Sequence, residues 1–338
     1  MDRPGPNPVW LKPLTVRHAA GVDPAALARA VVDPPPVPRP EVLGEAPQQP
    51  LPVFSDRALE GQGYPARMEH LLDDVAPELE QRLAAVDVGA VVILPPGPHR
   101  SGARWDRSAR LEETLSARVA PLRRARWWQP ERPVAPLQLL RRAADAVAAG
   151  RVPSVLLGGV DACAAPAACA DPRVRRQCAP AVDGPAAADA AAFVLLHNAQ
   201  ATREVRLCRI PVGGPPEDPT TWQRLLQEPL GEAEGGWAEL HGFGATPAQR
   251  HVWANTRRLV PWLRRAVAAE RYLLWRALGF AGGATLPLQL AAAAALLLGP
   301  GLPSRCLLIA ADDGTAGAAE LQRPGAGAEL STPMEGAT

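Results

Sequence analysis

The stretch LQLLRRAADAVAAGRVPSVLLGGVD, residues 137–161, decides the fold of this 338-residue chain. Apolar residues recur at helical spacing over 137–149, which predicts an amphipathic helix. Gly150 ends that helix, because glycine readily takes the left-handed conformation that stops one. The apolar run 155–157 then predicts a buried strand. A helix followed by a fully apolar strand is typical of an α/β fold whose sheets are covered on both faces.

The same alternation continues on both sides of this stretch. Two segments offer no such pattern: the proline-rich residues 33–52 predict a surface loop, and residues 322–338 predict a disordered tail. We expect helices and strands in the following order: a helix over 68–83, strands over 86–94, 191–196 and 205–212, a short strand over 237–240, a long helical stretch over 248–278, an alanine-rich helix after Gly283, and a strand over 306–310.

Composition excludes several classes of partner. The 36 basic residues nearly equal the 35 acidic ones, so no strong field attracts nucleic acid or an anionic membrane. The apolar run 286–298 is shorter than the roughly 20 residues that cross a bilayer. Residues 1–8 contain proline and charge instead of an apolar signal sequence. Five cysteines form an odd set, which favours a reduced, cytoplasmic protein.

Five segments resemble the β-ketoacyl synthases of the thiolase superfamily, and they occur in the family's order; the last, CLLIAADDGTAGAAEL at 306–321, is similar to the closing strand and glycine-rich turn of the fold. GGVD at 158–161 is similar to the family's turn after the strand that follows the nucleophile helix. AVDGPAAADAAAFVLLHNA at 181–199 is similar to the glycine-rich turn and the next strand. ELHGFG at 239–244 is similar to the first histidine motif, and LGFAGGATLPLQLAAAAALL at 278–297 to the second.

The resemblance implies a five-layered αβαβα fold built from two similar α/β halves, residues 1–203 and 204–321. It also implies that the chemistry is lost. The position of the nucleophilic cysteine falls on Pro133, and no cysteine precedes Cys163. Phe280 takes the place of the second histidine, and His241 remains as a relic of the first.

Three functions follow as hypotheses. The first is a catalytically inactive partner subunit or acyl-binding scaffold in fatty-acid or polyketide-type biosynthesis. Its expected partners are an acyl carrier protein and an active ketosynthase, in a homodimer or heterodimer. The second is an active acyltransferase that uses Cys163 and His241 as a relocated pair. The third is a purely structural interaction protein.

The other cysteine, aspartate and tryptophan groups are predicted to have structural roles. We expect neither a metal nor a cofactor. The spacing of Cys163, Cys169 and Cys178 matches no common zinc pattern, which predicts buried or loop thiols. The pair Asp312 and Asp313 before a glycine is typical of a turn. Trp127 and Trp128 lie in the arginine-rich stretch 118–132, which predicts a solvated basic loop with aromatic anchors. Because they lie just before the position of the missing nucleophile, they are also candidates to fill its pocket.

Overall fold

A computed structural model of the protein provides the three-dimensional arrangement. The description covers residues 7–34, 40–41, 51–55, 57–94, 108–128, 134–178, 185–199, 204–228, 237–242, 246–265, 270–299, 303–312 and 314–324.

Strands and helices alternate along the chain. The strands are β1 (Val9–His18), β2 (Pro40–Glu41), β3 (Leu51–Phe54), β4 (Ala90–Leu94), β5 (Arg126–Trp127), β6 (Ser154–Ala162), β7 (Ala187–His197), β8 (Val205–Arg209), β9 (Trp237–His241), β10 (Glu270–Tyr272), β11 (Arg305–Asp312) and β12 (Thr315–Gln322). The helices are α1 (Pro24–Val32), α2 (Tyr64–Leu83), α3 (Ser108–Arg118), α4 (Pro136–Ala148), α5 (Pro166–Cys169), α6 (Pro172–Gln177), α7 (Pro219–Leu225), α8 (Pro247–Leu259), α9 (Pro261–Arg265), α10 (Leu274–Leu278) and α11 (Thr285–Leu298).

The strands form two sets with the same internal order. The first set runs β1-β7-β6-β4-β5 and the second β8-β12-β11-β9-β10. In each set the first two neighbouring pairs are antiparallel and the last two are parallel. β1 and β8 pair with each other and join the sets edge to edge. The chain thus repeats one α/β topology twice.

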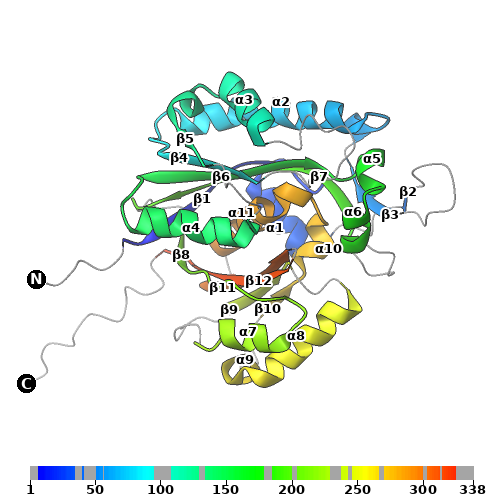
Figure 1. Ribbon diagram of the computed structural model, residues 1–338, viewed down its shortest axis with the longest axis vertical. Helices are drawn as coiled ribbons and strands as arrows, with labels where there is room; N and C mark the ends of the chain where they lie inside the picture. The colour runs from blue at the N-terminus through cyan, green and yellow to red at the C-terminus, as the bar shows by residue number, and fades with distance from the viewer. Residues whose placement is uncertain are drawn as a thin grey trace, which may run out of the picture.

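Helices cover both faces of each set, which gives five layers (Figure 1). α2 and α3 cover the outer face of the first set, and α7, α8 and α9 cover the outer face of the second. α1, α4, α10 and α11 lie between the two sets, where the largest apolar cluster forms. The predicted five-layered αβαβα fold is confirmed.

Proline starts many of these helices. It suits the first turn because its fixed φ is already helical and its missing N–H would have no intrahelical partner there. The helices whose first residue is proline begin at Pro24, Pro136, Pro166, Pro172, Pro219, Pro247 and Pro261.

The structure confirms most of the predicted elements and corrects their bounds. The strand expected over 86–94 begins only at Ala90, and GGVD at 158–161 continues strand β6 instead of forming a turn. The helix expected over 248–278 is wrong. It is interrupted before Pro261, where proline disfavours helical geometry in the preceding residue, and by β10, which is held by its pairing with β9.

The predicted loop and tail also change at their margins. β2 and β3 interrupt the loop expected over 33–52, and Gln322 ends β12, so the tail starts later than expected. Residues 35–39, 42–50 and 325–338 lie outside the described residues. The division into halves at residues 203 and 204 stays a prediction.

Glycines at the centre of β6 allow the first sheet to touch the segment that leads into α11. A Cβ built on Gly159 would lie 2.1 Å from the carbonyl oxygen of Gly283, and one on Gly158 would lie 2.3 Å from the ring of Phe193. Asp161 strengthens the same contact, because its carboxylate accepts the Gly283 N–H at 3.0 Å and the Tyr64 hydroxyl at 3.1 Å. A side chain at Gly159 would therefore force β6 and the segment before α11 apart.

We expect Gly159→Ala to lower the free energy of unfolding by about 1–3 kcal/mol, the usual cost of overpacking a close-packed core. Urea unfolding measures this loss. Gly63→Ala is the matched control, because a Cβ there meets only Pro65 at 4.0 Å. We expect it to cost no more than about 1 kcal/mol, since Gly63 is the N-cap of α2. Equal losses in the two variants would contradict the close contact.

Candidate functional site

The start of α4 is the place where the resemblance puts the nucleophile. β5 leads toward this helix, which begins at Pro136 after Ala135, and no side chain caps its first turn. Pro133 lies outside the described residues. Because no cysteine precedes Cys163 in the chain, neither the start of α4 nor the segment before it contains a thiol.

The two tryptophans ahead of α4 lie on opposite faces of the first sheet. Trp127 packs against the outer apolar cluster beneath α2 and α3, whereas Trp128 packs against the central cluster between the sheets. Val134, two residues before α4, packs against that same central cluster. Trp128 and Val134 therefore contact the central cluster, and Trp127 contacts the outer one.

His241 lies at the end of β9 and faces the outer layer, away from α11. Its Nε2 is 2.9 Å from Oε2 of Glu239, and its ring meets Trp253 of α8 edge to face at 5.3 Å between centroids. Leu240, which alternates with these two residues along the strand, belongs to the central cluster instead. His241 is therefore held as a structural partner of Glu239.

Glu239 is fully buried, and two guanidinium groups lie near its carboxylate. Besides His241, the Arg271 Nε lies 3.3 Å from Glu239 Oε2, and the Arg257 Nη2 lies 3.8 Å from Oε1. A buried carboxylate needs such partners, because taking a charge out of water is costly. Its position two residues before His241 puts both side chains on one face of the strand.

Phe280 lies beside β7 as a short extra bridge. Its N–H donates to the carbonyl of Ala186 at 2.7 Å, and its carbonyl accepts the N–H of Ala188 at 2.9 Å. Gly279 precedes it with a φ of 65°, and a Cβ there would lie 2.4 Å from the Ala186 carbonyl oxygen. The Phe280 ring packs against a small apolar cluster that also contains Cys163.

A buried ion pair holds the next residue of β7. The Nη1 of Arg67 on α2 lies 2.5 Å from Asp189 Oδ2, and Asp189 Oδ1 accepts the N–H of Ala164 at 2.9 Å. Both charged side chains are at most 3% exposed. Burial raises the pKa of Asp189 above its ordinary value, while the Arg67 guanidinium opposes the rise. Asp189 is a charged residue within an alanine-rich strand. Arg67 is a charged residue on the otherwise apolar buried face of α2.

None of the five cysteines lies on α4. Cys163, Cys169 and Cys178 are buried in the small cluster beside Phe280, and the Cys169 thiol donates to the carbonyl of Cys163 at 3.3 Å. Burial raises the pKa of the Cys306 thiol and raises that of the partly exposed Cys208 to about 11. Both thiols are therefore poor nucleophiles at neutral pH.

The structure does not bring the predicted site residues together as a catalytic group. Cys163 lies in the Phe280 cluster, whereas His241 contacts Glu239 and Trp253 in the outer layer of the second half. Asp312 ends β11 and pairs with Thr315, the geometry of a hairpin end; Asp313 lies outside the described residues.

Two kinds of feature are absent from the described residues. No helix there is long and apolar enough to span a membrane. Across the same residues, no three His, Cys, Asp or Glu side chains form a group that could hold a metal ion.

Solved structures of similar fold are known for this architecture. No family model and no curated protein matches the sequence. The oxazolomycin ketosynthase domain OzmH KS7 of Streptomyces albus JA3453 superposes with a TM-score of 0.63 at 15% identity, over 95% of this chain and 74% of that one. The ketosynthase ApeO in complex with its chain length factor ApeC, from Xenorhabdus doucetiae, gives 0.60 at 12% identity, over 96% and 100%. The ishigamide ketosynthase/chain length factor gives 0.56 at 19%, over 95% and 99%.

The protein therefore has the thiolase-like fold of ketosynthases and chain length factors. The resemblance that the sequence motifs indicate is confirmed at the level of the fold.

We expect His241→Ala to lower the free energy of unfolding by about 1.5–3 kcal/mol, because it removes a hydrogen bond to a buried carboxylate. His251→Ala is the control. That histidine is exposed on α8, where its Nε2 lies 3.0 Å from Asn255 Nδ2, so its loss should cost less than about 0.5 kcal/mol. Chemical unfolding compares the two. An unchanged stability of the His241 variant would contradict its structural role.

Removal of Arg67 should give a loss of stability that depends on pH. In Arg67→Met the Asp189 carboxyl stays buried without its cation, so its folded-state pKa rises further. A raised folded-state pKa costs stability above that pKa, and the cost disappears as the pH falls toward the unfolded value. We expect a loss of about 3–5 kcal/mol at pH 7.5 that becomes smaller at pH 5.

Urea unfolding at the two pH values measures this difference. Arg82→Met on the same helix is the control, because Arg82 forms an exposed pair with Glu78 that should contribute at most about 1 kcal/mol. A loss that is the same at both pH values, or larger at pH 5, would count against the buried charge of Asp189.

Proposed function

We propose that this protein is a catalytically inactive ketosynthase-like subunit, which acts as a partner subunit or acyl-binding scaffold in fatty-acid or polyketide-type biosynthesis. The observation that carries the proposal is the start of α4. A ketosynthase-type reaction requires a cysteine thiolate there to take the acyl group. The sequence has no cysteine in the first 162 residues, and the matching position is Pro133.

The surroundings of the other family positions support the same reading. The Phe280 ring has no hydrogen-bond donor for a thioester carbonyl, and its backbone is occupied by β7. His241 is engaged by Glu239 and faces the outer layer. Without the nucleophile, the remaining groups would give an acyl-transfer rate lower by orders of magnitude.

The expected partners rest on the solved structures of similar fold. ApeO is a ketosynthase in complex with its chain length factor, and the AntDE:AntF structure contains a type II acyl-carrier protein in complex with its ketosynthase. The AntDE:AntF match has a TM-score of 0.62 at 14% identity and covers 94% of this chain and 99% of that one. By analogy, we propose an active ketosynthase and an acyl carrier protein as partners of this chain.

The relocated pair Cys163 and His241 receives no support. The Cys163 thiol is fully buried in an apolar cluster, and His241 is already hydrogen-bonded to a buried carboxylate. A nucleophile and its base must lie within hydrogen-bond reach of each other.

Intact-mass spectrometry tests the proposal. The purified chain is incubated with acyl and malonyl carrier-protein thioesters, beside an intact ketosynthase as the positive control. We expect an acyl adduct on the control and an unmodified mass for this protein. A covalent adduct on any cysteine would refute inactivity, and a Cys163→Ala variant that loses the adduct would identify the relocated nucleophile.

The partner role has its own measurement. Sedimentation of this protein mixed with the ketosynthase encoded nearest to it should show a heterodimer. Independent sedimentation of the two chains would leave only the homodimer or structural alternatives and would contradict the partner-subunit role.

A further inference from the structure

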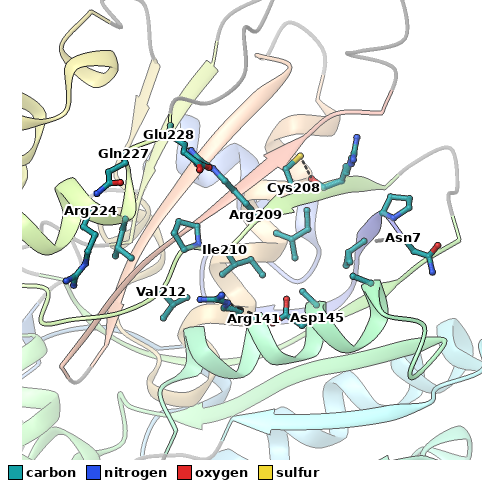
Figure 2. Close-up of a pocket in the computed structure, with 18 residues that line it drawn as sticks. Asn7, Arg141, Asp145, Cys208, Arg209, Ile210, Val212, Arg224, Gln227 and Glu228 are labelled. Atoms are coloured by element: carbon teal, nitrogen blue, oxygen red, sulfur yellow. Dashed lines mark hydrogen bonds and ion pairs between the residues drawn. The ribbon is translucent and has the colours of Figure 1, made fainter. Parts of the chain in front are cut away.

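A groove of 610 Å³ opens between the C-terminal part of α4 and the segment that follows β8 (Figure 2). Such a volume is within the range of small-molecule sites. The groove lies along Arg141 and Asp145, away from the start of α4 at Pro136. It is therefore separate from the position of the lost nucleophile.

The groove combines an apolar floor with a charged rim. Ile210 and Val212 are partly buried and pack against the central core. Four arginines line the groove, Arg141 from α4, Arg206 and Arg209 from β8, and Arg224 from α7; Figure 2 labels Arg141, Arg209 and Arg224. An apolar surface beside several guanidinium groups suits a ligand with an anionic head and an apolar body.

Arg209 is held in position by a buried carboxylate. Its Nε pairs at 3.0 Å with Glu320, whose side chain is only 7% exposed. The Nη1 and Nη2 groups point toward Glu228, at 3.3 Å from the carboxylate and 2.6 Å from the carbonyl. The Glu228 side chain is 85% exposed, so this outer pair contributes little to stability and can give way to another anion.

The guanidinium groups of Arg141 and Arg224 have weaker ion-pair partners than that of Arg209. Arg141 lies 3.9 Å from Asp145, and both side chains are more than half exposed. The Arg224 guanidinium lies near Gly214, where a Cβ would meet it at 3.1 Å, and it interacts electrostatically with the Asp218 carboxylate. Arg209 is thus anchored by the buried Glu320, whereas the counter-charge of Arg141 is exposed.

We infer that this groove binds an organic phosphate, whose phosphate groups pair with arginines of the rim and whose apolar part covers Ile210 and Val212. Phosphate fits because guanidinium groups bind its oxygens through paired hydrogen bonds. The site goes beyond the proposed scaffold role and does not depend on it.

Calorimetric titration of the full chain with inorganic phosphate, pyrophosphate and ADP tests the inference. We expect saturable binding, with ADP tighter than inorganic phosphate because only ADP reaches the apolar floor. Arg141→Gln and Arg224→Gln should each weaken ADP binding about tenfold, the effect of one charge-assisted contact. Glu228→Gln should strengthen binding, because it removes the competing carboxylate.

Arg142→Gln is the matched control, since Arg142 is exposed on the same helix but does not line the groove. We expect its affinity for ADP to equal that of the unmodified protein. Equal weakening by Arg142→Gln, or no saturable binding of any of the three probes at millimolar concentration, would overturn the inference. Binding of a polyglutamate peptide in place of the phosphates would also overturn it, in favour of an acidic protein partner.

Discussion

The close approach of β6 to the segment before α11 is the constraint on which the rest of the structure depends. Gly159 leaves room for the carbonyl of Gly283, and Asp161 binds the N–H of the same residue. This contact crosses from the first half of the chain to the second. Because close-packed interiors do not deform continuously, it fixes where α11 and the residues before it lie.

From that fixed point the neighbouring contacts follow. Phe280, three residues before Gly283, is placed beside β7, where its backbone bridges Ala186 and Ala188. The ion pair of Arg67 with Asp189 then holds the adjoining residue of β7 against α2. The architecture of a ketosynthase is thus maintained by packing and buried polar contacts that need no catalytic residue.

The sequence predicts the periodic parts of this fold well. α2, α4 and α11 have regular apolar patterns, and Gly150, with a φ of 65°, ends α4 as its position indicates. The sequence does not predict β1 or β12. β1 is interrupted at Pro13, where its pairing with β7 shifts, and β12 is rich in alanine and glycine, which have low strand propensity. Their stability comes from neighbours that are distant in sequence.

The site shows the same limit. His241 and Phe280 are visible in sequence motifs, but the partners that decide their roles are not. Glu239 could have been found, because it lies two residues before His241 on one face of a strand. Asp189 also gives a signal, as a lone charge in an alanine run. By contrast, the arginines of the groove come from three separate elements, and only the folded chain brings them to one place.

The absence of an activated thiol is the claim most directly open to measurement. Alkylation of the native protein at neutral pH, followed by peptide mass analysis, reports the reactivity of each cysteine. The account predicts slow labelling of Cys208 alone, faster as the pH approaches its pKa of about 11, with the buried cysteines protected. Rapid labelling of Cys163, or of any buried cysteine, at neutral pH would contradict it.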